Sequence, residues 1–182
     1  MRELSPDSAN TKWSLGYLPF VLCVVSVISD QVTKQVVAAK LELNERFPVI
    51  PGFFDFTHIH NSGAAWGMLQ GYPHFLSIVS GVMLCLMLIF RRSILIDCRS
   101  HRWAYGLLLG GIIGNFIDRV KYSYVIDFLF FFNGKFPAFN IADSCICVGV
   151  GLYIASSFWI QHHPLNDNGK GDNTGKPEDV EA

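Results

Sequence analysis

The chain has 182 residues, of which 51% are hydrophobic and only 16% are charged, whereas soluble domains average about 25% charged residues. Its formal net charge is −1 and it has no basic stripe interleaved with aromatic residues, so we expect no nucleic-acid partner. The charges avoid four long apolar runs, and this pattern excludes an ordinary water-soluble globule.

The first apolar run predicts a membrane-spanning helix over about 13–30, after a cytoplasmic N-terminus at 1–12. Its 17 residues from Trp13 to Ser29 include no Asp, Glu, Lys or Arg, and a span needs about 17–25 mostly apolar residues. The run is long for the core of a secretory signal, and no small-residue cleavage site follows it, so we expect it to remain as an anchor. Residues 31–41 predict an amphipathic helix lying along the membrane interface.

The next segment, about 44–72, predicts a small β element outside the bilayer, because it is rich in Pro and Gly and because residues 54–60 alternate as a strand does. Three further spans are expected over about 73–90, 103–118 and 138–160. Residues 161–182 contain five acidic and two basic residues with little apolar content, and they predict a disordered cytoplasmic tail. The expected fold is therefore an all-α membrane protein of four transmembrane helices with an outer β element and an interfacial helix.

Lys and Arg density near the span ends predicts the orientation. Segments 1–12 and 91–102 carry six bases in 24 positions, whereas 30–72 and 118–137 carry six in 63. We therefore expect both termini in the cytoplasm and the segments 30–72 and 118–137 on the outer side.

With this topology, the unusual polar residues all fall on the outer side. A charged residue inside a span costs about 2.5–3.5 kcal/mol on insertion scales, so such residues are seldom present without a use. The set comprises Asp30, Asn115, Asp118, Arg119, Asp127, Asn140 and Asp143. We expect a functional site in the outer leaflet.

Two of these carboxylates indicate a reaction. Asp127 and Asp143 have apolar neighbours and no adjacent base. If two carboxylates meet in a medium of low dielectric constant, they share one proton. Such a pair hydrolyses a peptide bond when the ionised member deprotonates a water and the protonated member polarises the scissile carbonyl.

Helical spacing groups other polar residues. Gly111, Asn115 and Asp118 share one face, and Asn140, Asp143 and Cys147 share another. Gly110 and Gly114 form a small-xxx-small pair for close helix packing. Asp30 and Lys34, at i and i+4, have the spacing of an ion pair. For these residues, polar packing between helices or contact with the membrane interface remains an alternative to a role in the site.

Five motifs in one order resemble those of bacterial lipoprotein signal peptidase, also called signal peptidase II. They are SDQVTK at 29–34, NSGAAWG at 61–67, GNFIDR at 114–119, VIDF at 125–128 and FNIADS at 139–144. The resemblance covers about 13–160. It implies a metal-free aspartic endopeptidase of the inner membrane that removes the signal peptide of prolipoproteins just before the diacylglyceryl-modified cysteine. It also implies lipidated prolipoproteins and membrane lipids as partners, no cofactor and a monomer.

The resemblance assigns roles residue by residue. The catalytic dyad falls on Asp127 and Asp143. Residues at positions that line the substrate site are Asn61, Asn115, Arg119 and Asn140, and those with a supporting role are Asp30, Lys34, Gly63, Asp118 and Ala142. Trp66 stands where the family usually has Phe, so the outer loop is expected to pack differently.

Other kinds of site receive less support. His58 and His60 share a strand face without a third ligand in reach, and exposed strand residues are the simpler interpretation. The sequence has no Gly-rich phosphate loop, and it reveals no histidine on the outer side that pairs as a base with Ser62, Ser144 or the cysteines. The rival function is a small cation-coupled transporter. A transporter needs polar groups near the midplane or at both mouths, whereas the inner halves of these spans are almost purely apolar.

Overall fold

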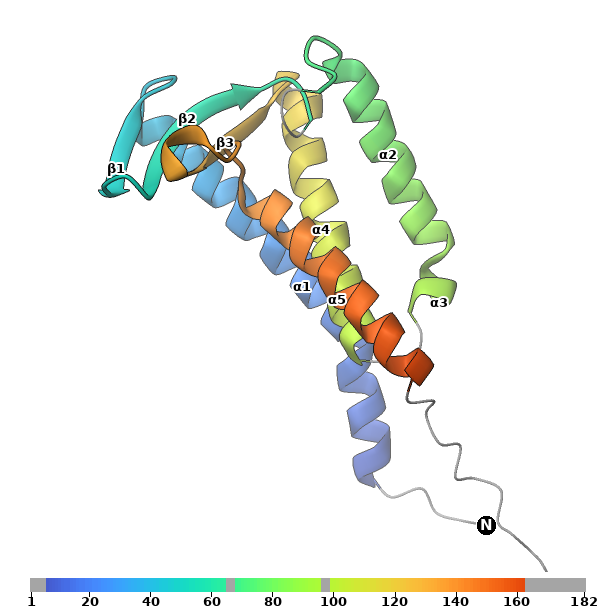
Figure 1. The fold of residues 1–182 in the computed structure, drawn as a ribbon. Coiled ribbons are helices and arrows are strands. Elements are labelled where there is room, and N and C mark those ends of the chain that lie inside the picture. Colours follow the sequence, from blue (N-terminus) through green and yellow to red (C-terminus); the bar gives the residue numbers. More distant parts are fainter. Residues whose placement is uncertain (1–5, 65–67, 96–98, 163–182) are drawn as a thin grey trace, which may run out of the picture.

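The computed structural model describes residues 6–64, 68–95 and 99–162. Five helices and a three-stranded sheet make up this part of the chain (Figure 1). In chain order they are α1 (Pro6–Lys40), β1 (Arg46–Ile50), β2 (Phe54–Asn61), α2 (Pro73–Ile89), α3 (Arg91–Ile94), α4 (Arg99–Tyr122), β3 (Val125–Phe131), the 3-10 turn η2 (Phe132–Gly134) and α5 (Ile141–His162). Trp66, the expected disordered tail from 163 onward and the first five residues of the expected N-terminal segment lie outside the described residues.

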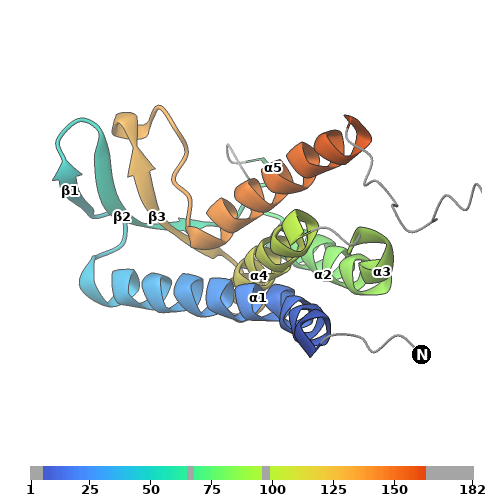
Figure 2. The same ribbon diagram turned by 90° about the horizontal axis from the view of Figure 1, so that it is seen from below.

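Helix α4 lies at the centre of the helical layer and contacts α1, α2 and α5 (Figure 2). Glycines permit this close approach. A Cβ added at Gly110 would lie 2.8 Å from the carbonyl oxygen of Cys23, and one at Gly114 would lie 2.7 Å from Oδ2 of Asp30. The small-xxx-small pair predicted from the sequence therefore packs against α1, and any larger side chain there would separate the two helices.

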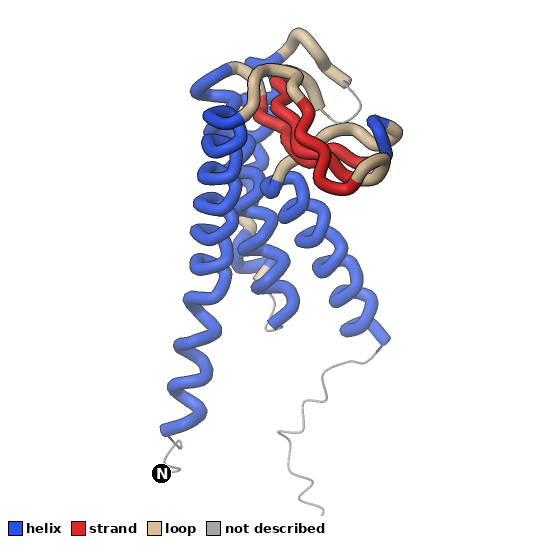
Figure 3. The backbone as a smooth tube through the Cα atoms, turned by 90° about the vertical axis from the view of Figure 1, so that its left-hand side faces the viewer, coloured by secondary structure: helices blue, strands red, loops and turns tan. Residues whose placement is uncertain are grey.

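The sheet has the order β1-β2-β3, and both pairs of neighbouring strands are antiparallel. Figure 3 shows the strands gathered at one end of the helices, opposite the end where α1 begins. The β element expected over 44–72 is present as β1 and β2. Strand β3 is a correction, because the β element was expected only over 44–72 and residues 118–137 only as a connection between two spans. Most of its residues are buried, on both faces of the strand, so it lacks the alternation that reveals a half-exposed strand.

Helix α1 differs from the expected span followed by an interfacial helix, because it runs as one helix through Lys40. Asp30 and Lys34 mark the expected break, yet their side chains are 0% and 1% exposed and form an ion pair across one helical turn. Thr33 Oγ1 donates a hydrogen bond to the carbonyl oxygen of Ser29 within the same turn. These contacts turn the polar face of the segment toward α4, and the helix continues instead of turning along the interface.

Two described helical segments, Tyr17–Lys40 and Ile141–His162, are long and apolar enough to cross a membrane, and a shorter apolar helix covers His74–Ile89. Helix α4 carries five charged residues near its ends, which lowers its hydropathy. Large apolar side chains point outward from the other helices, as lipid-facing residues do. Examples are Phe20, Val24 and Ile28 on α1, Ile78, Val82 and Ile89 on α2, and Val148, Ile154 and Phe158 on α5.

Candidate active site

One pocket of about 520 Å³ is lined by both acidic residues of the expected dyad. Asp127 extends from β3, and Asp143 extends from the first turn of α5. Asn61 and Arg119 also line the pocket, and most of the remaining wall is apolar. The fold therefore brings together two carboxylates that lie 16 residues apart in the sequence, beside a space large enough for a substrate segment.

Asp127 is 2% exposed and accepts a hydrogen bond at each carboxylate oxygen. Asn61 Nδ2 donates to its Oδ2 at 2.8 Å, and Asn140 Nδ2 donates to its Oδ1 at 2.8 Å. Burial, and next the negative charge of Asp143, raise the pKa of Asp127 to about 7, while the two amide donors and the Lys34 ammonium act in the opposite direction. Asp127 therefore holds a proton to far higher pH than an ordinary aspartate.

Asp143 is held by the start of α5. Its backbone N–H donates to Asn140 Oδ1 at 2.9 Å, and its own Oδ2 accepts from the backbone N–H of Asn140 at 3.2 Å. This reciprocal pair is a capping box, with Asn140 at the N-cap and Asp143 three residues later. The N-terminus of a helix favours a negative charge. The surroundings of the two carboxyl groups thus differ, because Asp127 is buried between two amide donors whereas Asp143 lies in the first turn of a helix.

Asn115 connects the two carboxylates with the helices behind them. Its Nδ2 donates to Asp143 Oδ1 at 2.7 Å, and its Oδ1 accepts from Asn140 Nδ2 at 3.1 Å and from Lys34 Nζ at 3.0 Å. Asn140 thereby bridges Asp127 and Asn115. Among the described residues, every buried side-chain nitrogen and oxygen has a hydrogen-bond partner, as a rigid polar network requires.

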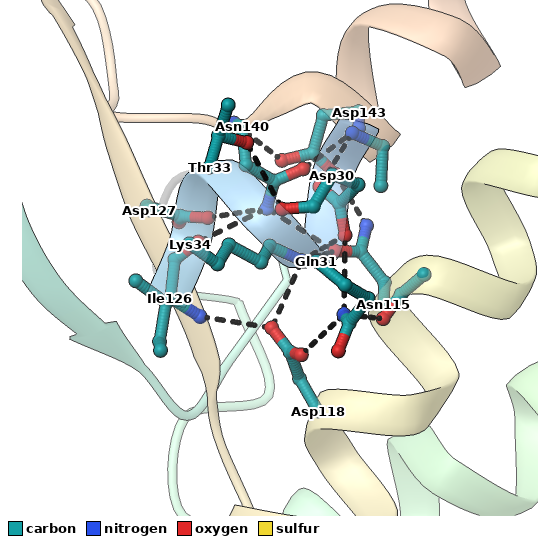
Figure 4. Close-up of polar contacts among 12 residues, drawn as sticks. Asp30, Gln31, Thr33, Lys34, Asn115, Asp118, Ile126, Asp127, Asn140 and Asp143 are labelled. Atoms are coloured by element: carbon teal, nitrogen blue, oxygen red, sulfur yellow. Dashed lines mark hydrogen bonds and ion pairs between the residues drawn. The ribbon is translucent and has the colours of Figure 1, made fainter. Parts of the chain in front are cut away.

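A buried charge cluster lies next to Asn115 (Figure 4). Lys34 Nζ is 2.8 Å from Asp30 Oδ2 and 2.9 Å from Asp118 Oδ2, and all three side chains are at most 2% exposed. Asp30 Oδ1 accepts from the backbone N–H of Ala142 at 2.9 Å, and Asp118 Oδ2 accepts from that of Ile126 at 3.3 Å. The structure thus brings these supporting residues into one network with the expected dyad.

Arg119 and Gly63 complete the expected set. Arg119 is half-buried in the pocket wall, and its guanidinium forms no hydrogen bond or ion pair with the described part of the chain. Both dyad carboxylates lie near enough to attract its charge. Gly63 donates its backbone N–H to Asn61 Oδ1 at 2.9 Å, which leaves the Asn61 amide nitrogen to face Asp127.

Gln31 belongs to the network although sequence reasoning gave it no role. Its Nε2 donates to Asp118 Oδ1 at 2.8 Å and to the carbonyl oxygen of Gly114 at 3.1 Å. A polar residue directly after Asp30 near the end of an apolar run was the available signal. The sequence also gave no indication of the hydrogen bond that Asp118 accepts from the Ile126 backbone, because a bond to a main-chain N–H leaves no pattern in the side chains.

The histidine pair lies outside this network. His58 Nε2 and His60 Nε2 are 3.2 Å apart, and His58 Nδ1 donates to the Leu41 carbonyl oxygen at 3.0 Å. Burial, and next the charge of His58, lower the pKa of His60. No group of three or more metal-binding side chains occurs in the described ranges.

Comparison with known proteins gives a consistent result. Residues 22–159 match the family model described as signal peptidase (SPase) II. The chain is 42% identical over 137 residues to a lipoprotein signal peptidase of Symbiobacterium thermophilum, covering 74% of this chain and 90% of that protein. It is 39% identical over 175 residues to one from Shewanella sediminis, covering 92% and 99%. A bacterial membrane enzyme solved by the in meso method at 2.3 Å resolution superposes with a TM-score of 0.76 at 36% identity, covering 84% of this chain and 94% of that one.

Proposed function

The chain belongs to the signal peptidase II family, and we propose that Asp127 and Asp143 are the catalytic dyad with which this membrane protease cleaves the signal peptides of prolipoproteins. Family membership removes the transporter as a rival. The observation that carries the assignment is that the two carboxylates line one pocket, in which burial and the charge of Asp143 raise the pKa of Asp127 to about 7. The test is processing of a purified, lipidated prolipoprotein in detergent by the wild type and by dyad variants.

The proposed reaction begins with Asp143 ionised and Asp127 protonated. Asp143 takes a proton from a water molecule, and the oxygen of that water attacks the scissile carbonyl carbon. Asp127 donates a hydrogen bond to the carbonyl oxygen as negative charge develops there. When the C–N bond breaks, the proton held by Asp143 passes to the leaving amine. The reaction consumes one water and needs no metal or other cofactor.

The proposed substrate position follows from the pocket wall. Its apolar residues, among them Phe139, Ile146 and Val148, suit a signal helix and acyl chains that lie in the bilayer. The polar end with the two aspartates suits the peptide bond just before the diacylglyceryl-modified cysteine. We propose membrane lipids as neighbours of this apolar wall and a monomer as the active form.

The pH dependence of the reaction follows from the raised pKa of Asp127. Since the proposed reaction needs a proton on Asp127, kcat/KM is expected to fall as pH rises through about 7. Initial rates on a lipidated substrate between pH 5 and 9 provide the measurement, with the thermal unfolding midpoint recorded at each pH as control. A rate that rises through pH 7–9 in folded protein would reverse the roles of the two carboxyl groups.

Arg119→Lys is expected to lower kcat/KM by more than threefold, although the charge is retained. The guanidinium in the pocket wall has no hydrogen-bond partner among the described residues, and its planar fork is able to bind two carbonyl oxygens at once, whereas an ammonium is a compact point charge. The measurement compares Arg119→Lys with Arg119→Ala, and Lys121→Ala serves as the matched control because Lys121 is exposed on the same helix end. A smaller loss for lysine would make Arg119 an interface anchor.

We propose that α1, α2, α4 and α5 each cross the inner membrane, with both termini in the cytoplasm and the site at the outer face. Helix α4 extends beyond its charge-free middle part at both ends, so it is long enough to cross the membrane. The position of the sheet at one end of the helices also supports four spans. The start of α1 and the end of α5 lie at the opposite end.

Cysteine labelling tests this orientation. In a background without the native cysteines, an impermeant thiol reagent applied from outside is expected to label cysteines placed at Gln70 and Ser123, which flank the sheet end. A cysteine at Ser93, in the exposed α3 turn, is expected to react only after the membrane is opened. The reverse labelling pattern would overturn the orientation and the outer location of the site.

A further inference from the structure

The three asparagines beside the dyad each have an amide orientation that is set by a group able only to donate. The backbone N–H of Gly63 donates to Asn61 Oδ1, and that of Asp143 donates to Asn140 Oδ1. For Asn115 this donor is the Lys34 ammonium. Because each amide oxygen is occupied by such a donor, each amide nitrogen is directed at a carboxylate. Lys34 is the one of these three donors that belongs to a side chain.

Lys34 has three acceptors for its three N–H bonds. They are Asp30 Oδ2 at 2.8 Å, Asp118 Oδ2 at 2.9 Å and Asn115 Oδ1 at 3.0 Å (Figure 4). An ammonium points its protons in three directions, whereas the donors of a guanidinium lie in one plane. The site is therefore shaped for lysine and not merely for a positive charge.

Each of these three acceptors is also hydrogen-bonded to a residue of the dyad or to the residue directly before one. Asp30 accepts from the backbone N–H of Ala142, which precedes Asp143. Asp118 accepts from the backbone N–H of Ile126, which precedes Asp127. Asn115 donates directly to the Asp143 carboxylate. One ammonium on α1 thus connects with the start of α5, with β3 and with a reacting side chain.

We propose that Lys34 is a positioning residue that sets the separation and orientation of the two aspartates through these three connections, a role that rests on the proposed dyad. It lies behind Asn115 and is absent from the pocket lining, so it acts through other residues. Its removal changes the geometry of the reacting groups more than the affinity of the pocket wall for substrate. The expected signature is a fall in kcat with little change in KM.

The same ammonium acts on Asp127 electrostatically. The groups that face Asp127 are Asp143 on α5, Lys34 on α1 and the amides of Asn61 and Asn140, with the charge of Arg119 nearby on α4. Lys34 favours the ionised form of Asp127. Without it, the carboxyl holds its proton to higher pH, and the basic limb of the kcat/KM profile moves upward from its wild-type position near 7.

The test uses Lys34→Met, which keeps the aliphatic stem, and Lys34→Arg, which keeps the charge. Both are expected to lower kcat of the folded protein at least tenfold with KM changed less than threefold, and Lys34→Met is expected to move the basic limb upward. Lys40→Met is the matched control, because Lys40 is exposed on the same helix. Full activity of Lys34→Arg would reduce the role to charge, and unchanged kcat in folded Lys34→Met would overturn the proposal.

Stability is separated from positioning by two further variants. Lys34→Met leaves two buried carboxylates without their partner, so Lys34→Met/Asp118→Asn is made as well, because it keeps the cluster at one net negative charge. His101→Ala removes a buried polar side chain at the other end of α4, where it contacts Ser157. If Lys34→Met and Lys34→Met/Asp118→Asn both fail to fold, the role of Lys34 is structural. The same conclusion follows if His101→Ala reproduces the loss of kcat per folded molecule. Turnover by Asp127→Asn or Asp143→Asn would instead refute the dyad itself.

Discussion

Replacing Asp127 or Asp143 by asparagine is expected to abolish prolipoprotein cleavage. Each carboxyl has a separate task, since one activates water and the other polarises the carbonyl, and a positioned acid or base contributes about 10²–10⁴-fold. We expect kcat/KM to fall at least about a thousandfold in each variant. The measurement is release of the signal peptide from a purified, lipidated prolipoprotein, followed by mass spectrometry. The double variant is expected to be scarcely worse than either single one, because half of a catalytic unit is nearly as poor as none.

The control for this experiment is Asp55→Asn. Asp55 is also buried, on β2, but does not line the pocket, so its replacement is expected to leave turnover per folded molecule unchanged. Asp127→Asn carries a small structural cost of its own, because both oxygens of Asp127 accept amide hydrogens and asparagine offers one oxygen. Folding is therefore measured in parallel. Substantial turnover by folded Asp127→Asn or Asp143→Asn would refute the dyad.

The charge-free runs of the sequence locate two of the helices, and the sequence also points to polar residues that the structure joins in one network. Runs without charge mark α2 and α5 within a few residues. The position of Asp127 and Asp143 at one depth of the membrane stays a prediction that comes from counting spans. Both signals depend on composition along the chain, which a membrane imposes strongly.

The sequence did not suffice where burial is decided by pairing in space. The pattern of residues 31–41 suggested a helix along the membrane interface, yet the ion pair and α4 cover Asp30 and Lys34. Strand β3 escaped detection because the sheet and the helices cover both of its faces, so that Asp127 sits among apolar neighbours without alternation. The direction in which each asparagine side-chain amide points also depends on a hydrogen-bond donor that only the fold places beside it, such as the backbone N–H of Gly63 beside Asn61.

Asn140 connects both halves of the proposed site, and two substitutions separate its two roles. Its Oδ1 caps α5 by accepting from the backbone N–H of Asp143, while its Nδ2 donates to Asp127 Oδ1 and Asn115 Oδ1. Serine is about as good an N-cap as asparagine, whereas alanine costs about 1 kcal/mol of stability at this position. Asn140→Ser therefore keeps the cap and removes only the amide donor.

We expect Asn140→Ser to unfold within a few degrees of the wild type and yet to lose about 10–100-fold in kcat/KM. Asn140 Nδ2 donates to the protonated Asp127 carboxyl and to Asn115. Each bond between neutral groups contributes about 0.5–1.5 kcal/mol, and the loss of both corresponds to a fall in rate of this order when they hold the reacting carboxyl. Asn140→Ala is expected to lose activity to a similar extent and to unfold at a lower temperature than Asn140→Ser. Thermal unfolding and kcat/KM on one lipidated substrate provide both measurements for the three proteins. If Asn140→Ser keeps full activity while Asn140→Ala loses both activity and stability, Asn140 acts only as a helix cap, and the bridge from Asp127 to Asn115 has no part in the reaction.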